Sequence, residues 1–463
     1  MPLPRHRLFA ALLVVCLGTL TAPLDSAVNI AFPSITAAFG LEQAAIRWVI
    51  ISYVLTYASL SLVFGKVGDL LGYRRVFVAG LVFSTLGFAA CAVAPNFAAL
   101  LIGRILQGVG AALSWSCAPS LATSLYPESE RTRILGFYSA AIAVGTALGP
   151  LAGGVLVQIY GWRVVFWGRL PIVLAGLALA WLIPATLRVT TERRYDLTGA
   201  LLLIGWLGAL LLAAARPEME YAAAATGALL LGGLACFAAF LVHESRHDDP
   251  IIRPSLFQDP GFLALNLASI AVNLAGFSVM LLVPFHLAGS VGLAPALGGL
   301  VLGCNATGII VGSLAAGKLA TRFGQAPVAY LGTAISVVGL SLVATWTAHT
   351  RPVHMAVCLG LQGFGLGLFQ VAFADRVLAT LPQSDRGVAG SLTLVTRTLG
   401  VIGAASGLTA LNHALAASAA SIGRTDAALI GFQQTFALVA SGLGLGMFLT
   451  AMMAAIKQRR KPA

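Results

Sequence analysis

Long apolar runs separated by short polar segments make up almost the whole chain. A helix needs about 20 mostly apolar residues to cross a bilayer, and on that measure the sequence predicts fourteen spans. They are expected at 8–37, 45–64, 75–94, 97–124, 133–158, 163–184, 197–215, 221–242, 262–288, 296–316, 327–347, 353–375, 388–416 and 430–455. The predicted fold class is therefore all-α, a polytopic membrane protein. An even number of spans puts both termini on the same side.

Composition supports a bilayer as the solvent of this chain. Apolar residues make up 59% of it, charged residues only 10%, and the mean hydropathy is +0.92, whereas soluble domains are about a quarter charged. The cysteines all lie inside apolar runs and show no disulfide or metal-binding spacing. They are Cys16, Cys91, Cys117, Cys236, Cys304 and Cys358. We expect them to be small packing residues.

Lysine and arginine are distributed unevenly between the predicted loops. With the N-terminus inside, the outer segments hold only Arg47, Arg163, Arg216, Arg351 and Arg424, and the inner segments hold far more. The positive-inside rule then predicts a cell (inner) membrane protein with both termini cytoplasmic. Topology thus accounts for the net charge of +12, and no nucleic-acid partner is expected.

Three short segments recur in the second half of the chain. Residues 65–72 recur at 317–324, which is 252 positions later, whereas 107–110 recur at 362–365 and 127–131 at 382–386, both 255 positions later. Parallel repeats of this kind are a transporter architecture with the substrate site between the halves. We predict a six-helix bundle at 1–188, a second at 259–463, and an inserted helix pair with its linkers at 189–258.

Four motifs resemble a known family. Residues 65–75 (GKVGDLLGYRR) look like the loop between helices 2 and 3 of the major facilitator superfamily, and 104–111 (RILQGVGA) look like its helix 4 motif. Residues 145–154 (GTALGPLAGG) resemble the helix 5 motif of its antiporters, and 24–33 (LDSAVNIAFP) the helix 1 motif of its fourteen-helix drug:proton antiporters. The resemblance implies the major facilitator fold and alternating-access export driven by inward proton flow. The expected partners are a small-molecule substrate, protons and the lipid bilayer, and we expect a monomer.

The loop at 65–75 is a candidate conformational latch. Gly65 and Gly72, with Gly68 between them, permit close helix approach and a sharp turn. Asp69, Arg74 and Arg75 could then form a charged latch at the inner face. Alternatively, Lys66 and the two arginines are topology anchors only. The second copy has Thr321 in place of Asp69, which argues against the same latch there.

Residues 145–153 carry Gly145, Gly149 and Gly153 at four-residue spacing, with Pro150 among them. Small residues at this spacing let two helices touch closely, and an internal proline kinks a helix. We interpret this segment as a bending helix 5 gate that seals the exit path. The alternative is a static helix contact.

Asp25 and Arg104 are predicted to lie deep in the membrane. By helical rise Asp25 is about 25 Å from the inner face, and Arg104 is about 10 Å below the outer face, so both fall in the outer half. Asp25 is the only carboxylate placed deep enough to be shielded from both faces, which makes it the candidate proton carrier, with Arg104 as its partner. Asn29, one turn on, could bind the carboxyl or a substrate. The alternative is a purely structural pair.

Two further arginines affect the expected substrate charge. Arg397 is placed near mid-membrane, and Arg169 takes a place where the family often has asparagine. If both face the central cavity, three arginines oppose Asp25 alone, which favours neutral, zwitterionic or anionic substrates over cations. Arg169 could instead snorkel outward.

A set of aromatic and polar residues is predicted to line the substrate route. Arg104, Gly108, Ala111 and Trp115 share a helix face, which directs Trp115 to wherever Arg104 points. The other candidates for substrate binding are Asn29, Gln107, Tyr53, Tyr57, Tyr138, Phe369 and Arg397. A lone aromatic residue in a membrane helix is nevertheless more often a packing residue.

The leading prediction is a proton-coupled exporter of small amphipathic molecules. One alternative is an uptake symporter or a dedicated exporter for a neutral or anionic metabolite, and a remote one is a membrane-embedded enzyme or receptor. No metal-ligand cluster is recognisable, because His286 and His413 are isolated in apolar runs and the other five histidines lie in or near loops. No phosphate-binding loop is present. We therefore expect no cofactor and no metal, and an ion gradient as the energy source.

Overall fold

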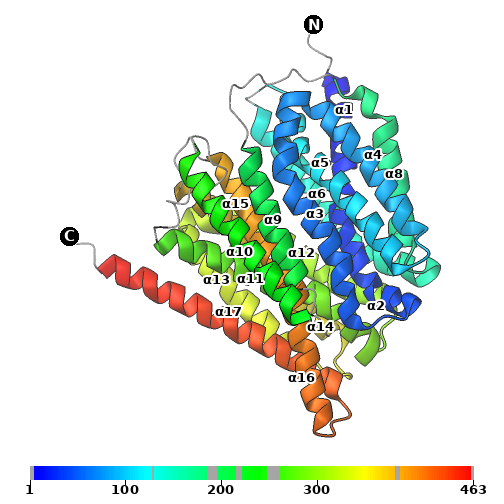
Figure 1. Ribbon diagram of the computed structural model, residues 1–463, viewed down its shortest axis with the longest axis vertical. Helices are drawn as coiled ribbons and strands as arrows, with labels where there is room; N and C mark the ends of the chain where they lie inside the picture. The colour runs from blue at the N-terminus through cyan, green and yellow to red at the C-terminus, as the bar shows by residue number, and fades with distance from the viewer. Residues whose placement is uncertain are drawn as a thin grey trace. The chain divides into compact units, whose positions relative to one another are not determined.

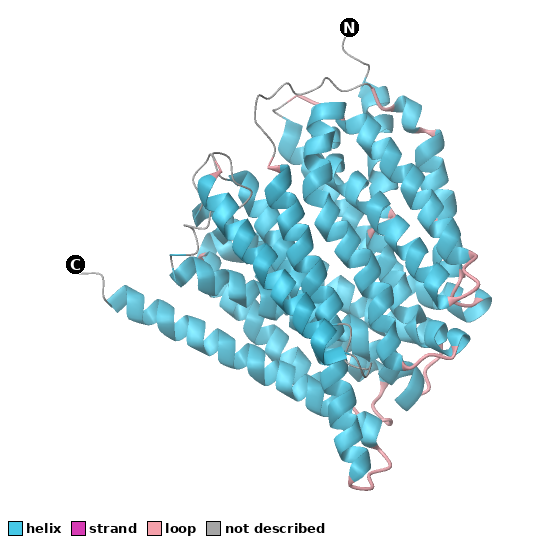
Figure 2. Ribbon diagram, viewed as in Figure 1, coloured by secondary structure: helices cyan, strands magenta, loops and turns pink. Residues whose placement is uncertain are grey.

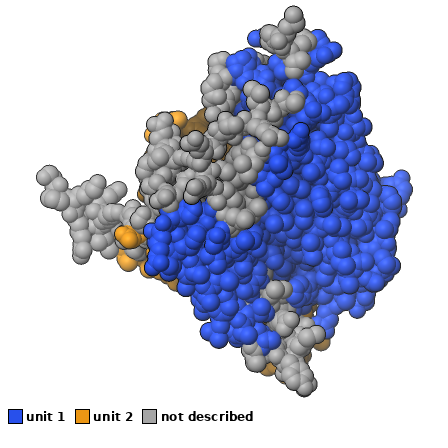
Figure 3. Space-filling view, turned by 45° about the horizontal axis from the view of Figure 1, so that its top comes forward, with its two compact units in different colours: residues 1–251 blue, residues 252–463 orange. Residues whose placement is uncertain are grey.

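The computed structural model describes residues 5–127, 130–184, 196–214, 222–247, 258, 260–380 and 386–459. All regular elements in these residues are helical (Figures 1 and 2). The chain forms two compact units, residues 1–251 and 252–463, which Figure 3 shows in blue and orange. The predicted inserted pair, α9 and α10, belongs to the first unit, where α9 contacts α3.

Unit 1 contains ten α-helices and short 3₁₀ turns in its described part. In chain order they are α1 (Arg5–Leu20), the turn η1 (Pro23–Ser26), α2 (Ala27–Phe39), the turn η2 (Gln43–Ala45), α3 (Ile46–Leu71), α4 (Tyr73–Ala92), α5 (Phe97–Ser124), α6 (Arg131–Tyr160), α7 (Val164–Trp167), α8 (Leu170–Ala178), the turn η4 (Ala180–Leu182), α9 (Leu197–Ala214) and α10 (Ala222–Arg246).

Unit 2 contains seven α-helices and two π-helical turns in its described part. They are α11 (Pro260–Phe285), the π turn η6 (His286–Ser290), α12 (Pro295–Phe323), α13 (Gln325–Val343), α14 (Pro352–Thr380), α15 (Arg386–Gly403), the π turn η8 (Ala404–Leu408), α16 (Thr409–Ser421) and α17 (Ala427–Arg459).

Thirteen helical segments of the described chain are long and apolar enough to cross a membrane. They coincide with thirteen of the predicted spans, and α9, with 18 residues, occupies the place of the remaining one. The all-helical polytopic class is therefore confirmed. The count of fourteen and the arrangement as two six-helix bundles stay predictions.

Both units contain a closely packed helix pair built on glycine. A Cβ added at Gly87 of α4 would meet the Gln107 backbone nitrogen of α5 at 2.5 Å. One added at Gly339 of α13 would meet the Gln362 nitrogen of α14 at 2.7 Å. Without a hydrophobic force between helices in lipid, such close approach is what holds them together. The two halves of the chain thus share not only short sequence segments but also a helix interface in which a glycine packs against the backbone of a glutamine.

The turns that follow the first repeated segment also match. Gly72, between α3 and α4, has φ +92°, and Gly324, between α12 and α13, has φ +88°. Side chains disfavour this left-handed region, so glycine at both positions permits the two sharp turns. This positive φ angle explains why a glycine is needed for the sharp turn predicted at Gly72.

Candidate proton-coupling and substrate site

Asp25 lies on a break in the first membrane segment. The 3₁₀ turn η1 separates α1 from α2 and begins at Pro23, a residue that cannot donate a backbone hydrogen bond. The Ser26 hydroxyl donates to the Pro23 carbonyl at 2.8 Å and to the Thr146 carbonyl of α6 at 3.3 Å. The carboxylate is therefore carried by a tightly wound turn that is tied to α6.

The glycine face of α6 lies directly against this turn. A Cβ added at Gly145 would meet Leu20 Cδ1 at 2.7 Å, and one at Gly153 would meet Ala27 Cβ at 2.7 Å. At Gly149 an added Cβ would overlap the Ser26 hydroxyl. The residues of the predicted helix 5 gate, including Pro150 inside α6, thus belong to the helix that packs on the Asp25 turn. Whether α6 bends as a gate stays a prediction.

Asp25 accepts hydrogen bonds from three side chains. Arg104 donates through Nη1 to Oδ1 at 2.7 Å and through Nη2 to Oδ2 at 2.9 Å, a bidentate pair. Arg169 donates through Nη1 to Oδ1 at 2.6 Å. Gln107 donates through Nε2 to Oδ1 at 2.8 Å and accepts from Arg104 Nη1 at 2.8 Å. We call Asp25, Arg104, Gln107 and Arg169 the charge cluster.

The charge cluster is almost completely enclosed. The side chains of Arg104 and Arg169 are 3% and 4% exposed, and that of Asp25 is 14% exposed. Arg104 also donates through Nε to the Val49 carbonyl at 3.0 Å and lies 4.4 Å from the centre of the Tyr53 ring. Two buried cations against one anion leave a net charge of one positive.

Arg169 is held by its own helix turn and by aromatic rings. Its Nε donates to the Val165 carbonyl at 2.7 Å, and the guanidinium lies 4.7 Å from the centre of the Phe88 ring. Its Nη2 is buried and makes no hydrogen bond within the described chain. One buried donor of the cluster is thus left without a hydrogen-bond acceptor in the described chain. The outward-snorkelling alternative for Arg169 is not what the structure shows.

Three predicted substrate-binding aromatics follow one another beside Arg104. The Tyr53 ring stacks at 6.2 Å on Tyr57, which in turn meets Trp115 edge-on at 5.5 Å. Trp115 Nε1 donates to the Thr19 carbonyl at 3.4 Å. Tyr138 on α6 is buried. Tyr53, Tyr57 and Trp115 thus form an aromatic row leading from the charge cluster.

The remaining candidates lie elsewhere. Asn29 is half-buried on α2 and is not among the described donors to Asp25. Phe369 belongs to unit 2, where it is buried and stacks on Phe373, and its backbone packs against Gly332. Arg397, also in unit 2, is exposed. Asp375 of α14 accepts a hydrogen bond from Gln325 at 2.6 Å.

The predicted latch is only partly described. Gly65 lies in the last two turns of α3 and Gly72 directly follows that helix, while Arg74 is half-buried and Arg75 is exposed. The side chains of Lys66 and Asp69 lie outside the described residues. The latch therefore stays a prediction.

Sequence reasoning did not foresee the role of Gln107 in the charge cluster, and it left the direction of Arg169 open. Gln107 was expected to contact substrate, but here it bridges Asp25 and Arg104. Arg169 follows a break between α7 and α8. A helix interruption just before a buried arginine was the one signal that could have pointed to it.

Comparison with known proteins places the chain in a family. A sequence profile described as Major Facilitator Superfamily matches residues 14–405. The riboflavin transporter RibZ of Clostridioides difficile (strain 630) is 26% identical over 95% of this chain and 96% of its own length. The puromycin resistance protein pur8 of Streptomyces alboniger is 30% identical over 97% and 91%. The crystal structure of an auto-inhibited POT family peptide transporter has a TM-score of 0.70 and 16% identity, over 99% and 98% of the two chains.

The chain belongs to the Major Facilitator Superfamily and is a multi-pass membrane transport protein. Its relatives include several drug-resistance and export proteins of bacteria. The alternative of a membrane-embedded enzyme or receptor is therefore set aside. The fourteen-helix antiporter subfamily stays a prediction.

Proposed function

We propose that the protein is a proton-coupled exporter of small molecules that works by alternating access, with Asp25 as the proton carrier. The observation that carries this proposal is the enclosed charge cluster on a broken helix. An ionisable group inside a membrane protein is costly and usually functional. The resistance and export functions in the names of several relatives favour the export direction.

The arrangement of charges supports a coupling step. Protonation of Asp25 in place would leave two buried guanidinium groups facing a neutral carboxyl, which is a costly arrangement. Proton uptake therefore requires Asp25 to separate from Arg104 or Arg169. Because Gly145, Gly149 and Gly153 of α6 contact the segment around the Asp25 turn, movement of α6 would change this separation. Transport conformation and protonation would thus be linked.

Asp25→Asn tests this proposal. We expect loss of pH-gradient-driven transport, while exchange of substrate without a gradient survives because exchange needs no net proton movement. The measurement is uptake into proteoliposomes with an imposed pH gradient, with riboflavin and puromycin as first probes, chosen from the names of the relatives.

The matched control is Asp426→Asn, which removes an exposed carboxylate paired with Arg424 at 2.9 Å and should leave transport unchanged. Normal gradient-driven transport by folded Asp25→Asn protein would refute the assignment of Asp25.

The free donor of Arg169 favours a second candidate function, the proton-coupled transport of an anionic or neutral metabolite. An anion that binds Arg169 Nη2 would compete with Asp25 for the two arginines. Displaced from them, Asp25 could take up a proton, so proton and anion would bind together and move in the same direction. This is a symport, whereas drug:proton exchange moves substrate and proton in opposite directions.

Arg169→Asn separates the two candidates. In a symporter of anions we expect this change to weaken substrate binding by roughly 10–100-fold, the cost of losing a charged hydrogen bond of about 1.5–3 kcal/mol. In an exporter of neutral or cationic drugs it should preserve or improve binding, because it removes a positive charge. The readout is the apparent affinity for matched anionic, neutral and cationic probes. Reversing the pH gradient in the same liposomes gives the direction of coupling.

A further inference from the structure

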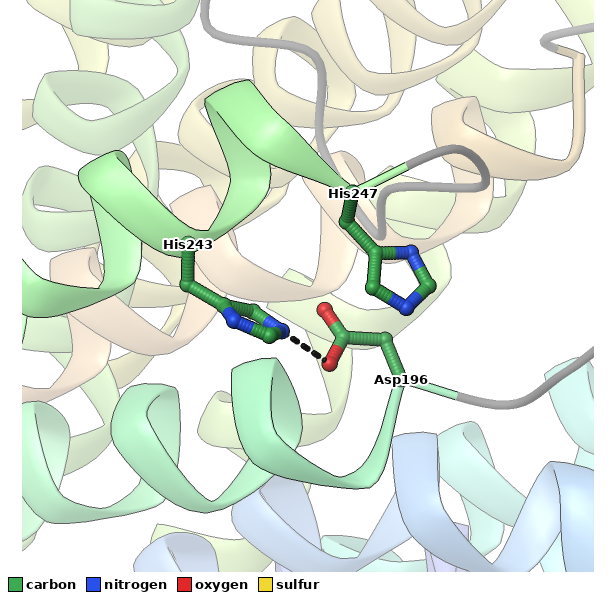
Figure 4. A group of neighbouring side chains, drawn as sticks. All are labelled: Asp196, His243 and His247. Carbon is green, nitrogen blue, oxygen red and sulfur yellow. Dashed lines mark hydrogen bonds and ion pairs between the residues drawn. The ribbon is translucent and has the colours of Figure 1, made fainter.

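The cytoplasm-facing ends predicted for α9 and α10 bring together three metal-ligating side chains. Asp196 immediately precedes α9, while His243 lies in the last turn of α10 and His247 directly follows it. One ligand atom from each of the three lies within 4.8 Å of the others. Figure 4 shows both imidazole rings beside the Asp196 carboxylate.

The sequence spacing on α10 is one that helices use to bind metal. The segment His243-Glu244-Ser245-Arg246-His247 places the two histidines four residues apart, the spacing that puts two side chains on one face of a helix, with His247 one residue past the end of α10. The pattern His-Glu-x-x-His on a helix presents two imidazoles to one zinc ion. The pattern alone is a weak signal. The aspartate contributed by a neighbouring helix, as a third ligand of the right chemistry, makes it specific.

Asp196 is held in place before any metal arrives. Its Oδ1 accepts the Gly199 backbone N–H at 2.7 Å, which caps α9, and lies 2.6 Å from His243 Nε2. Its side chain is 2% exposed, against 30% for His243. These contacts hold the carboxylate toward the histidines.

A second buried acidic side chain lies next to the site. Glu244 is 2% exposed. A Cβ added at Gly199 would meet Glu244 Oε1 at 2.6 Å and would overlap Asp196 Oδ2. Both acidic side chains thus converge on Gly199, a position of α9 that has no side chain. A cation bound beside these enclosed acidic groups would stabilise their ionised forms.

We propose that Asp196, His243 and His247 bind a divalent transition metal ion, with Zn²⁺ as the best match to two imidazoles and one carboxylate. The ion would replace the contact between His243 and Asp196 and join the start of α9 to the end of α10. The three ligand atoms, which lie within 4.8 Å of one another, would each come to about 2.0–2.2 Å from the bound ion. Glu244 is buried against Asp196 and so does not present a base to a metal-bound water. The site binds metal without hydrolytic activity.

The test uses the full-length protein, purified in detergent without a histidine tag and stripped with EDTA. Zn²⁺ titration by calorimetry should show one ion per chain, and Co²⁺ should give the visible absorption of a four- or five-coordinate site. His247→Ala removes one ligand but keeps the His243–Asp196 contact, so it should lower Zn²⁺ affinity by more than the roughly 10–100-fold that outer-shell changes cost. Asp196→Asn keeps the helix-capping acceptor and should also weaken binding.

The matched control is His349→Ala, which removes an exposed histidine of unit 2 and should leave binding unchanged. Added Zn²⁺ should also raise the melting temperature of the wild-type protein, and not that of folded His247→Ala. Wild-type protein without saturable, stoichiometric Zn²⁺ binding, or equal affinity in His247→Ala, would overturn the proposal. The His243–Asp196 contact would then be an ordinary helix-to-helix ion pair.

Discussion

The α4–α5 pair of unit 1 and the α13–α14 pair of unit 2 have the same backbone design and different chemistry. Ser84 and Gly110 pack backbone to backbone in the first pair, and Ser336 and Gly365 do so in the second. A glutamine of the repeated Gln-Gly-x-Gly segment lies buried in each. The glycine and serine positions are therefore what the repeat has in common.

The buried polar groups on these interfaces differ. In unit 1, Gln107 bridges Arg104 and Asp25. In unit 2 the position equivalent to Arg104 is Leu359, and Gln362 accepts a hydrogen bond from the neutral Asn305. One scaffold thus carries an ionic network in one unit and a neutral contact in the other. Close helix packing does not require the charges, so the charges of unit 1 need another explanation, and coupling provides one.

The largest contrast between the units should come from Arg104→Leu, which gives unit 1 the residue of unit 2. It removes the bidentate partner of a buried carboxylate, so we expect a loss of about 3–5 kcal/mol in the free energy of unfolding. Leu359→Met, a volume-conserving change at the equivalent position, should cost under about 1.5 kcal/mol. Thermal unfolding in detergent and proteoliposome transport measure both. Similar losses in the two variants would remove the contrast.

Substitutions at the paired glutamines, Gln107 and Gln362, should show a smaller difference between the units in the loss of unfolding free energy. Gln107→Met loses hydrogen bonds to charged groups, worth about 1.5–3 kcal/mol, whereas Gln362→Met loses one to a neutral amide, worth about 0.5–1.5 kcal/mol. The same unfolding measurement should therefore rank Gln107→Met as the more damaging change. If Gln362→Met proved equally damaging, Gln107 would be acting through packing and not through charge.

Substitutions at the paired glycines, Gly87 and Gly339, should lower the free energy of unfolding by similar amounts. Gly87→Ala and Gly339→Ala each push a methyl group into the backbone of the facing glutamine, and such overpacking costs about 1–3 kcal/mol. Because the geometry is alike, the two losses should agree within about 0.5 kcal/mol. A large difference would show that the two interfaces are less alike than their shared glycines indicate.

Sequence alone supplied the positions of the spans and the neighbourhood of Asp25 and Arg104. The helical rise per residue gives the depth of a residue in the membrane. Counting residues from the start of each span therefore shows which residues of neighbouring helices lie at the same depth. Rise does not fix the direction of a side chain around its helix, so counting alone does not reveal that Phe369 is buried against Phe373 in unit 2.

Counting also fails where a helix is interrupted. Arg169 follows the break at Gly168 between α7 and α8, so neither its depth nor its direction follows from a regular helical rise. The sequence therefore could not decide whether Arg169 faces the central cavity or snorkels outward. His243 and His247 had a visible four-residue spacing, but their third partner, Asp196, is 47 positions from His243 along the chain. Only folding brings such distant positions together.

The 3₁₀ turn η1 allows the first membrane segment to change its length and to rotate one end against the other if the turn rewinds as an α-helix. A 3₁₀ helix rises about 2.0 Å per residue with three residues per turn, against about 1.5 Å and 3.6 for an α-helix. Rewinding four residues from one form to the other would shorten the segment by about 2 Å and rotate one end against the other by about 80°. A displacement of that size exceeds the tolerance of the hydrogen bonds from Arg104 and Arg169. Local rewinding of Pro23–Ser26 would therefore suffice to uncouple Asp25 from its arginines, with no need to slide a whole helix through the bilayer.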